Sequence, residues 1–227
     1  MRAFLAIRIP LDQRVAGVDE TAAVEPEPFD APPVEPVPVE PATDSLRRDQ
    51  LRQLLGEFAS LGTAVRPVAD DGVHLTLKFF GELSAEQVET AGEVTGAVVA
   101  EMFDFDLHLR GLGAFPSERR PSVIWAGVAD GGECGRLVRE LELALGEAGF
   151  PAEARPFQPH VTLARIKARP PARLAELLAE FAAADFGCLP VSTIELVASE
   201  LRPGGPRYST LAKFRLGAGP RAVERSS

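Results

Sequence analysis

The sequence predicts a mixed fold of strands and helices in two similar lobes, each with an antiparallel or mixed sheet. The first observation is a pattern that occurs twice, at His74-Leu75-Thr76-Leu77 and at His160-Val161-Thr162-Leu163, in a chain of 227 residues with only three histidines. The second is the order of the expected elements, because each copy is a strand candidate that a helix and further strands follow. The two copies start 86 residues apart (160 − 74), so the chain has the pattern of a duplicated unit.

The first half of the chain gives a signal for each element in turn. Branched and aromatic residues favour strands, and Ser84 with Gln87 makes a capping box that begins a helix. Gly149 ends the last helix of this half. The expected elements are a strand at 2–9, a helix near 45–60, a strand at 63–68, the first motif strand at 73–80, the helix from Ser84, strands at about 103–115 and 122–128, and a helix at 132–148.

The second half repeats this order more compactly. The motif strand at 160–166 is followed by a helix at 171–184, which begins after two prolines. A strand at 189–199 and a last strand at 207–216 complete the pattern. We therefore predict a single bilobed domain over 1–216, with 217–227 as a flexible tail.

An acidic, proline-rich segment at 17–45 interrupts the strands and helices. Between Arg14 and Arg47 there are eight Asp or Glu residues and no Lys or Arg, so this stretch carries −8 of the formal net charge of −9. Seven prolines between Pro26 and Pro41 are incompatible with a helix and favour extended polyproline conformations. We expect a disordered surface insertion here. A docking segment for a proline-reading partner is the alternative.

The composition is that of a globular protein, at 45% apolar residues. The sequence has no run of about 18 apolar residues for a membrane span. Its first ten residues are too short and too charged for a signal peptide. Cys134 and Cys188 match no C-x-x-C metal or redox spacing, so we interpret them as buried reduced thiols. These features predict a cytoplasmic protein without a membrane partner.

Each motif is expected to present an imidazole and a hydroxyl together. In an extended strand, residues i and i+2 share a face, so His74 lies beside Thr76 and His160 beside Thr162, while the residues between them face the core. The third histidine, His108, has no Thr two residues later and lies in a strictly alternating strand. We interpret it as a surface residue.

Two imidazoles and two hydroxyls suit acid–base chemistry on a phosphate. One imidazole can remove a proton while the other donates one, since both titrate near neutral pH. Thr hydroxyls can bind the non-bridging oxygens of a phosphate, and nearby Arg or Lys can offset its charge. The residues themselves therefore favour phosphodiester cleavage.

Three alternatives to phosphodiester cleavage stay open on the residues alone. A zinc site needs three or four ligands, and the two histidines have no Cys, Asp or Glu at ligand spacing. A serine hydrolase would need a G-x-S-x-G turn, which the sequence lacks. Two structural histidines buried among strands would account for the periodicity but not for the duplication.

Basic residues gather beside the second motif. The stretch 157–175 has no Asp or Glu, and it contains Arg165, Lys167, Arg169 and Arg173. An anionic ligand is expected on this side.

The motifs and four longer segments resemble the two-histidine phosphoesterase superfamily. Within it, the chain is most similar to the bacterial RNA 2′,3′-cyclic phosphodiesterases of the ThpR or LigT group, once described as 2′-5′ RNA ligases. The resemblance covers nearly the whole chain except the insertion at 17–45. The segments that carry it are the opening at 1–7, the run Val73-His74-Leu75-Thr76-Leu77-Lys78-Phe79-Phe80-Gly81-Glu82, the stretch 115–128, and Phe157-Gln158-Pro159-His160-Val161-Thr162-Leu163-Ala164-Arg165.

The resemblance implies a bilobed α+β fold in which two duplicated lobes, related by a pseudo-two-fold axis, flank a central cleft with helices on the outside. It also implies metal-independent hydrolysis of a 2′,3′-cyclic phosphate to a 2′-phosphomonoester, with no cofactor. His160 would be the proton acceptor, His74 the proton donor, and Thr76 and Thr162 would hold the phosphate. The basic residues near His160 are expected to lower its proton affinity, which suits a base.

Further substrate contacts are expected from Arg165, Phe79, Arg119 and Arg120, and the last three have a plain structural alternative. Arg165 would meet the phosphate, and Phe79 could stack on a base, as could Phe115 or Phe157, unless these aromatic side chains only pack in the core. Arg119 and Arg120 precede the strand of Trp125 and could follow an RNA backbone, unless they are simple surface charges.

Two other functions stay open beside hydrolysis of RNA ends or cyclic nucleotides. The same residues could catalyse the reverse reaction and act as a 2′-5′ RNA ligase, although equilibrium in water favours hydrolysis. Alternatively, the motifs could bind a nucleotide or phosphate without catalysis. We expect a monomer in either case.

Overall fold

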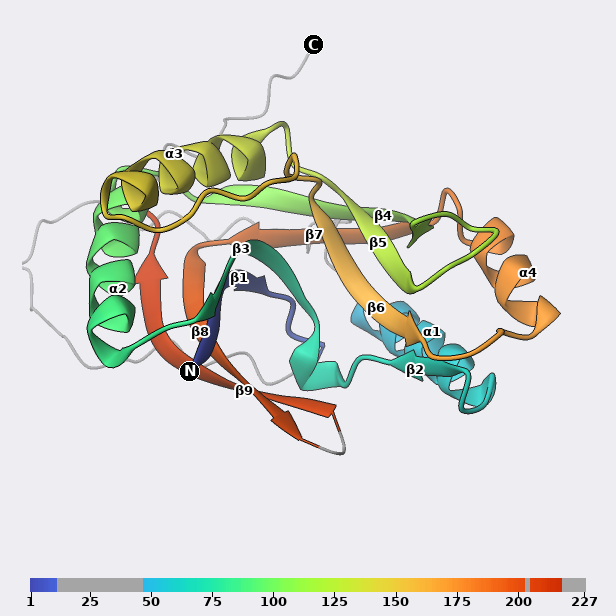
Figure 1. Cartoon of the computed structure of the whole chain (residues 1–227). Coiled ribbons are helices and arrows are strands. Elements are labelled where there is room, and N and C mark those ends of the chain that lie inside the picture. Colours follow the sequence, from blue (N-terminus) through green and yellow to red (C-terminus); the bar gives the residue numbers. More distant parts are fainter. Residues whose placement is uncertain (12–46, 203–204, 218–227) are drawn as a thin grey trace, which may run out of the picture.

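The computed structural model describes residues 1–11, 47–202 and 205–217. These residues form an α+β fold with one curled antiparallel sheet of nine strands and four α-helices (Figure 1). None of the helices in these ranges is long and apolar enough to cross a membrane. The predicted insertion at 17–45 lies outside the described residues, as does the predicted tail apart from Gly217.

The strands are β1 (Arg2–Arg8), β2 (Val65–Pro67), β3 (His74–Glu82), β4 (Phe105–Phe115), β5 (Val123–Ala129), β6 (His160–Ile166), β7 (Asp185–Val191), β8 (Thr193–Arg202) and β9 (Gly205–Arg215). The helices are α1 (Arg48–Ser60), α2 (Ala85–Ala100), α3 (Glu133–Glu147) and α4 (Ala172–Glu180), with a 3-10 turn at Asp70–Gly72. Figure 1 shows α2 and α3 at one end of the sheet and α1 and α4 at the other.

The predicted start of one helix and the predicted end of another are confirmed. The Ser84 hydroxyl accepts from the Gln87 N–H at 3.2 Å, and the Gln87 side chain accepts from the Ser84 N–H at 3.0 Å, which completes the capping box of α2. Gly149 follows α3 with a φ of 89°, a left-handed conformation that glycine adopts without strain.

Two predicted elements of the second half were wrong in their bounds. Helix α4 ends at Glu180 rather than at 184, and the residues after it belong to a link to β4, where two backbone N–H groups donate to the carbonyls of Phe181 and Ala184. The strand predicted at 189–199 is two strands, β7 and β8. The chain changes partner between them, since β7 pairs with β4 and β8 pairs with β1 and β9.

The strand order is β7-β4-β5-β6-β3-β1-β8-β9, and β2 pairs with β6 on the side. The two motif strands are therefore neighbours at the centre. Strands β4 and β5 follow β3 in the chain but extend the sheet from β6, whereas β8 and β9 follow β6 but lie beyond β3 and β1. The predicted fold class is confirmed. Its two lobes are halves of one continuous sheet, and each half takes strands from both halves of the chain.

The main core lies on the face of the sheet that the helices cover. Leu5 and Ile7 of β1 are buried there together with Leu75 and Val161 of the motif strands. Because side chains alternate along a strand, the residues between them point to the other face. A second, small cluster forms on that face from Phe4, Ala6 and Val197, with Tyr208 packed against it.

Candidate active site

Strands β3 and β6 are joined at one residue pair, Leu75 with Val161, in antiparallel register. Counting outward from this pair sets the histidine of each motif opposite the threonine of the other. By this count, His74 faces Thr162 and Thr76 faces His160. All four are half-buried, whereas Leu75 and Val161 are fully buried on the other face. One polar cluster therefore spans both motif strands.

The two imidazoles are oriented in the same way. His74 Nδ1 lies 2.6 Å from the carbonyl oxygen of Gly72, and His160 Nδ1 lies 2.7 Å from that of Gln158. A carbonyl can only accept, so Nδ1 donates its N–H in both cases. The neutral ring then carries its lone pair on Nε2, which can take up or deliver a proton. Both motifs thus prepare the same nitrogen for chemistry.

Aromatic rings fix each imidazole from the side. His74 stacks on Phe4 at 4.9 Å between ring centroids, and Tyr208 meets His74 edge-on at 5.3 Å. His160 meets Phe115 edge-on at 5.0 Å, and Phe115 in turn packs against Trp125 at 5.3 Å. Phe4 and Tyr208 were not predicted as parts of the site. Both come from strands that are distant in the chain and reach His74 only through the sheet order.

An extra residue interrupts each motif strand just after its threonine. The register shifts by one residue at Leu77, against β1, and at Leu163, against β5. Such a bulge changes the face to which the following side chains point. The fifth residue after each histidine, Phe79 in β3 and Arg165 in β6, is exposed, while the residue before it is buried. The β3 side of the site therefore gains the aromatic ring of Phe79, and the β6 side gains the guanidinium of Arg165.

Burial and the charges of two arginines act on His74. Burial lowers the pKa of His74 below its usual value, the Gly72 hydrogen bond opposes this, and the charges of Arg8 and Arg165 lower it further. Arg8 lies opposite His74 in the β1–β3 register. Its Nε donates to Glu195 at 3.3 Å, and its guanidinium donates to the Asp71 carbonyl at 2.6 Å. The sequence did not identify Arg8.

Arg165 also acts on the first motif, which the sequence did not predict. Its charge contributes to the lowered pKa of His74 on the other motif strand. It also opposes the raised pKa of Tyr208, which burial causes. Arg165 has no hydrogen-bond or ion-pair partner within the described ranges, so its guanidinium can bind an anion there.

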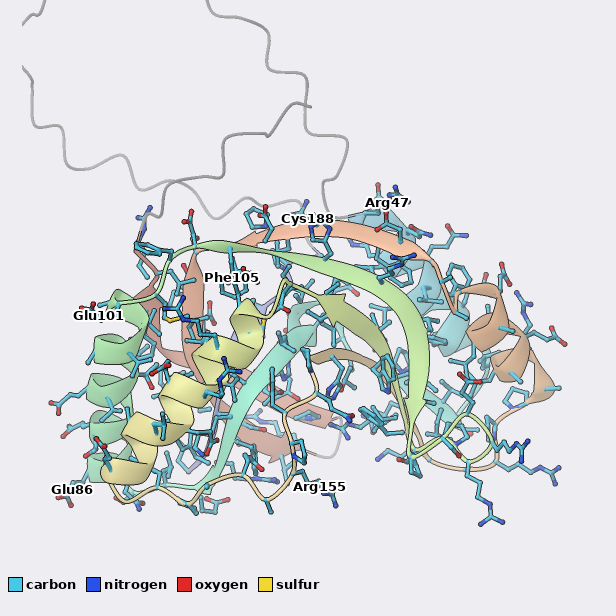
Figure 2. All side chains as sticks on the ribbon, turned by 90° about the horizontal axis from the view of Figure 1, so that it is seen from above. Arg47, Glu86, Glu101, Phe105, Arg155 and Cys188 are labelled. Atoms are coloured by element: carbon cyan, nitrogen blue, oxygen red, sulfur yellow. The ribbon has the colours of Figure 1, made fainter. Side chains whose placement is uncertain are left out.

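A groove of about 1010 Å³ begins at Thr76 and His160 and runs between β3, α3 and the segment before β6. It contains all three aromatic residues that the sequence offered for base stacking. Two arginines that the sequence did not identify also line it. The main lining residues are Phe79, Phe115, Phe157, Val138, Leu143, Arg139 and Arg155. Figure 2 shows Arg155 on the segment that links α3 to β6.

Other predicted residues do not reach this site. Arg119 and Arg120 are exposed in the loop between β4 and β5, and they do not line the groove, although Pro116 and Ser122 at the two ends of this loop do. His108 is half-buried on β4 and also lies outside the groove.

Cys134 and Cys188 form no disulfide and lie outside the groove. Cys134 is buried, as predicted, and burial raises its pKa above the usual value, whereas Cys188 is only half-buried. Within the described ranges, no three His, Cys, Asp or Glu side chains form a group that could hold a metal ion.

A family model described as the 2′-5′ RNA ligase superfamily matches residues 38–202 of the chain. The chain belongs to this superfamily. Curated relatives include the RNA 2′,3′-cyclic phosphodiesterase of Aeropyrum pernix, 41% identical over 168 residues that cover 73% of this chain and 94% of the relative. The RNA 2′,3′-cyclic phosphodiesterase of Methanothermobacter thermautotrophicus is 33% identical over 170 residues, which cover 74% of this chain and 92% of the relative.

Solved structures of similar fold cover nearly the whole chain. TT0787 of Thermus thermophilus has a TM-score of 0.67 and 28% identity, covering 96% of this chain and 99% of its own. Escherichia coli LigT complexed with 3′-AMP has a TM-score of 0.60 and 24% identity, covering 95% of this chain and 97% of its own. At this identity the similarity is one of fold alone. The resemblance that the motifs suggested is confirmed at the level of the superfamily.

Proposed function

We propose that this protein hydrolyses RNA 2′,3′-cyclic phosphodiester ends, or 2′,3′-cyclic nucleotides, to a 2′-phosphomonoester without a metal ion. The observation that carries the proposal is the register of β3 and β6, which sets each motif histidine opposite the threonine of the other motif. The names of the relatives at 33–41% identity support the same reaction.

The proposed reaction is a displacement at phosphorus. Water attacks the phosphorus while His160 Nε2 takes its proton, a P–O bond to the water oxygen forms, and the bond from phosphorus to O3′ breaks. The proton on His74 Nε2 goes to the departing O3′. The hydroxyls of Thr76 and Thr162 donate to non-bridging oxygens, whose negative charge Arg165 offsets. Proton exchange with solvent then resets both imidazoles.

The roles of the two histidines can be separated with a sulfur leaving group. In a 2′,3′-cyclic phosphorothiolate with sulfur at the 3′ position, the 3′ sulfur leaves as a thiolate. A thiolate needs little help from an acid to depart. We therefore expect His74→Ala to lose much less activity on this substrate than on the oxygen substrate, while His160→Ala loses a similar factor on both. The opposite pattern would exchange the two roles.

Product analysis tests the reaction itself. An RNA oligomer that ends in a 2′,3′-cyclic phosphate should yield only a 2′-monophosphate, and the rate should persist in EDTA. A 3′-monophosphate product would contradict the proposal, and loss of activity in EDTA with recovery on adding zinc would favour a metal site. Binding of the oligomer without any turnover would instead indicate a nucleotide-binding module.

Ligation is the second candidate, because the superfamily that matches the chain is named for it. In ligation, the 5′-hydroxyl of a second RNA would replace the attacking water, the bond from phosphorus to O3′ would break, and a 2′-5′ bond would form with the same residues. An excess of 5′-hydroxyl RNA in the oligomer assay would reveal this product. We rank it below hydrolysis because water competes with the hydroxyl at every turnover.

We also propose a cytoplasmic monomer. All four motif residues come from one chain, so the cluster needs no second copy to be complete. Cys134 and Cys188 form no disulfide with each other, which suits a reducing compartment. Sedimentation velocity of the purified chain should give a single species near its mass of 24.3 kDa.

A further inference from the structure

We propose that the groove beside His160 binds the RNA on the 5′ side of the cyclic phosphate, so that the protein prefers an RNA chain of two or more nucleotides to a cyclic mononucleotide. This inference rests on the proposed function and adds the part of the substrate that does not react. The groove is defined by the lining residues Phe79, Phe115, Phe157, Val138, Leu143, Arg139 and Arg155.

The position of the groove ties its occupant to the reacting phosphorus. Thr76 and His160 belong both to the motif cluster and to the groove lining, whereas His74 and Thr162 are not part of that lining. A molecule in the groove therefore touches one end of the cluster and extends away from it toward α3. A volume of about 1010 Å³ lies at the upper end of the range for small-molecule sites, which is about 300–1,000 Å³.

The chemistry of an RNA end leaves one candidate for the occupant. A 2′,3′-cyclic phosphate is itself the 3′ end of its chain, so no nucleotide follows it. Whatever continues from the reacting phosphorus is its own nucleoside and then the phosphodiester and nucleosides on the 5′ side. A groove that starts at the phosphate site and extends well beyond it matches the direction in which the rest of the RNA chain continues.

The walls of the groove suit bases. Phe79 is 43% exposed and Leu143 is 66% exposed, so both offer apolar surface to a ligand in the groove. The bulge at Leu77 turns Phe79 toward this side, beside Thr76. The Arg2 guanidinium lies 5.3 Å from the centre of the Phe79 ring and covers part of it, which leaves the rest of the ring for a base.

The charges of the groove suit a phosphodiester. Lys78 and Glu142 neutralise each other through a 2.7 Å ion pair, and Glu153 is exposed at the rim. Arg139 and Arg155 are exposed and have no hydrogen-bond or ion-pair partner within the described part of the chain. These two guanidiniums are free to hold the first phosphodiester on the 5′ side.

The test compares two substrates, 2′,3′-cyclic AMP and the dinucleotide ApA with a terminal 2′,3′-cyclic phosphate. We expect kcat/KM to be about tenfold higher for the dinucleotide, the size of one charge-assisted contact. In the double variant Arg139→Gln/Arg155→Gln, the ratio of the two kcat/KM values should fall toward one. The advantage of the dinucleotide should also shrink with added salt in the wild type and much less in the variant.

The matched control is Arg136→Gln, a change of the same kind on α3 at a residue outside the groove. It should keep the wild-type ratio. A double variant whose ratio equals that of the control would overturn the proposal. So would a wild-type protein that hydrolyses both substrates with equal kcat/KM.

A failure of the proposed function gives a different result. If neither substrate is hydrolysed, binding of ApA with a 2′-phosphate is measured by calorimetric titration of the same three proteins. Weaker binding by the double variant than by Arg136→Gln would then support the groove, and equal binding by both would overturn it.

Discussion

His74 and His160 make the same hydrogen bond, each from its Nδ1 to the carbonyl oxygen two residues earlier. Two segments of different sequence, one ending in Gly72 and one in Gln158, therefore give their imidazoles the same tautomer. This equivalence fits a reaction in which one ring accepts a proton and the other donates one at the same phosphorus.

Loss of either imidazole should reduce turnover by about 10²–10⁴-fold, the usual contribution of a general acid or base. The variants are His74→Ala and His160→Ala, and the measurement is kcat on a 2′,3′-cyclic nucleotide. His108→Ala is the matched control, since His108 lies on β4 outside the groove. A motif variant that keeps the activity of the control would remove that histidine from the mechanism.

The pH dependence of the reaction should report His74. The proposed acid must carry a proton, so activity should fall as the pH rises through the pKa of His74, which is lowered from 6.5. Replacing Arg8 with Gln removes a charge that repels the proton. The pKa of His74 should then rise, and the alkaline limb of kcat/KM should move to higher pH.

For Arg8→Gln the measured quantity is the pH at which the alkaline limb of kcat/KM falls, rather than the absolute rate. Arg136→Gln serves again as the control because Arg136 is not among the charges that act on His74. An alkaline limb that stays in place in Arg8→Gln, or moves to lower pH, would contradict the assignment of His74 as the acid.

The ion pair of Lys78 and Glu142 should matter for stability. The Lys78 ammonium is 2% exposed and donates to Glu142 at 2.7 Å and to the Pro151 carbonyl at 3.0 Å, so it ties β3 to α3 and to the segment before β6. Lys78→Met would leave the Glu142 carboxylate without its cation. We expect a loss of about 3 kcal/mol in the free energy of unfolding, because one partner of a buried pair remains.

Urea denaturation followed by circular dichroism measures this loss. The double variant Lys78→Met/Glu142→Gln removes the unpaired charge and should recover part of it. If Lys78→Met unfolds at the same urea concentration as the wild type, the ion pair does not contribute to the fold as described.

Removal of residues 19–44 should change little. The deletion would take out an acidic, proline-rich segment whose composition gives it few apolar residues to bury. We expect a melting temperature within a few degrees of the wild type and an unchanged kcat, measured by calorimetry and by the cyclic nucleotide assay. A deletion variant that fails to fold would show that 17–45 is not an insertion.

The local parts of the site were predictable from the sequence, and the long-range parts were not. Alternation along a strand was enough to pair His74 with Thr76 and His160 with Thr162. It could not predict the bulges at Leu77 and Leu163, because a two-residue period counted onward from Thr162 puts Arg165 on the wrong face. The sequence linked Arg165 to the site only because basic residues cluster there.

The residues that the sequence missed reach the site through the sheet order. Phe4 and Arg8 come from β1, and Tyr208 from β9, and the topology that brings them to His74 exchanges strands between the two halves of the chain. No local pattern encodes that exchange. The sequence could not assign Arg139 to the groove for a similar reason. An exposed arginine on a helix resembles any other solvated charge until the residues on the opposite side of the groove are known.

The most direct test of the central claim is an NMR titration of both imidazoles with 2′-AMP, the expected product, followed through the histidine ring protons with assignments from the His74→Ala and His160→Ala variants. Because one phosphate should contact both rings, the signals of His74 and His160 should shift together with a single dissociation constant, while His108 stays unchanged. Movement of only one of the two signals, or saturation at clearly different 2′-AMP concentrations, would contradict a shared phosphate between the motif strands.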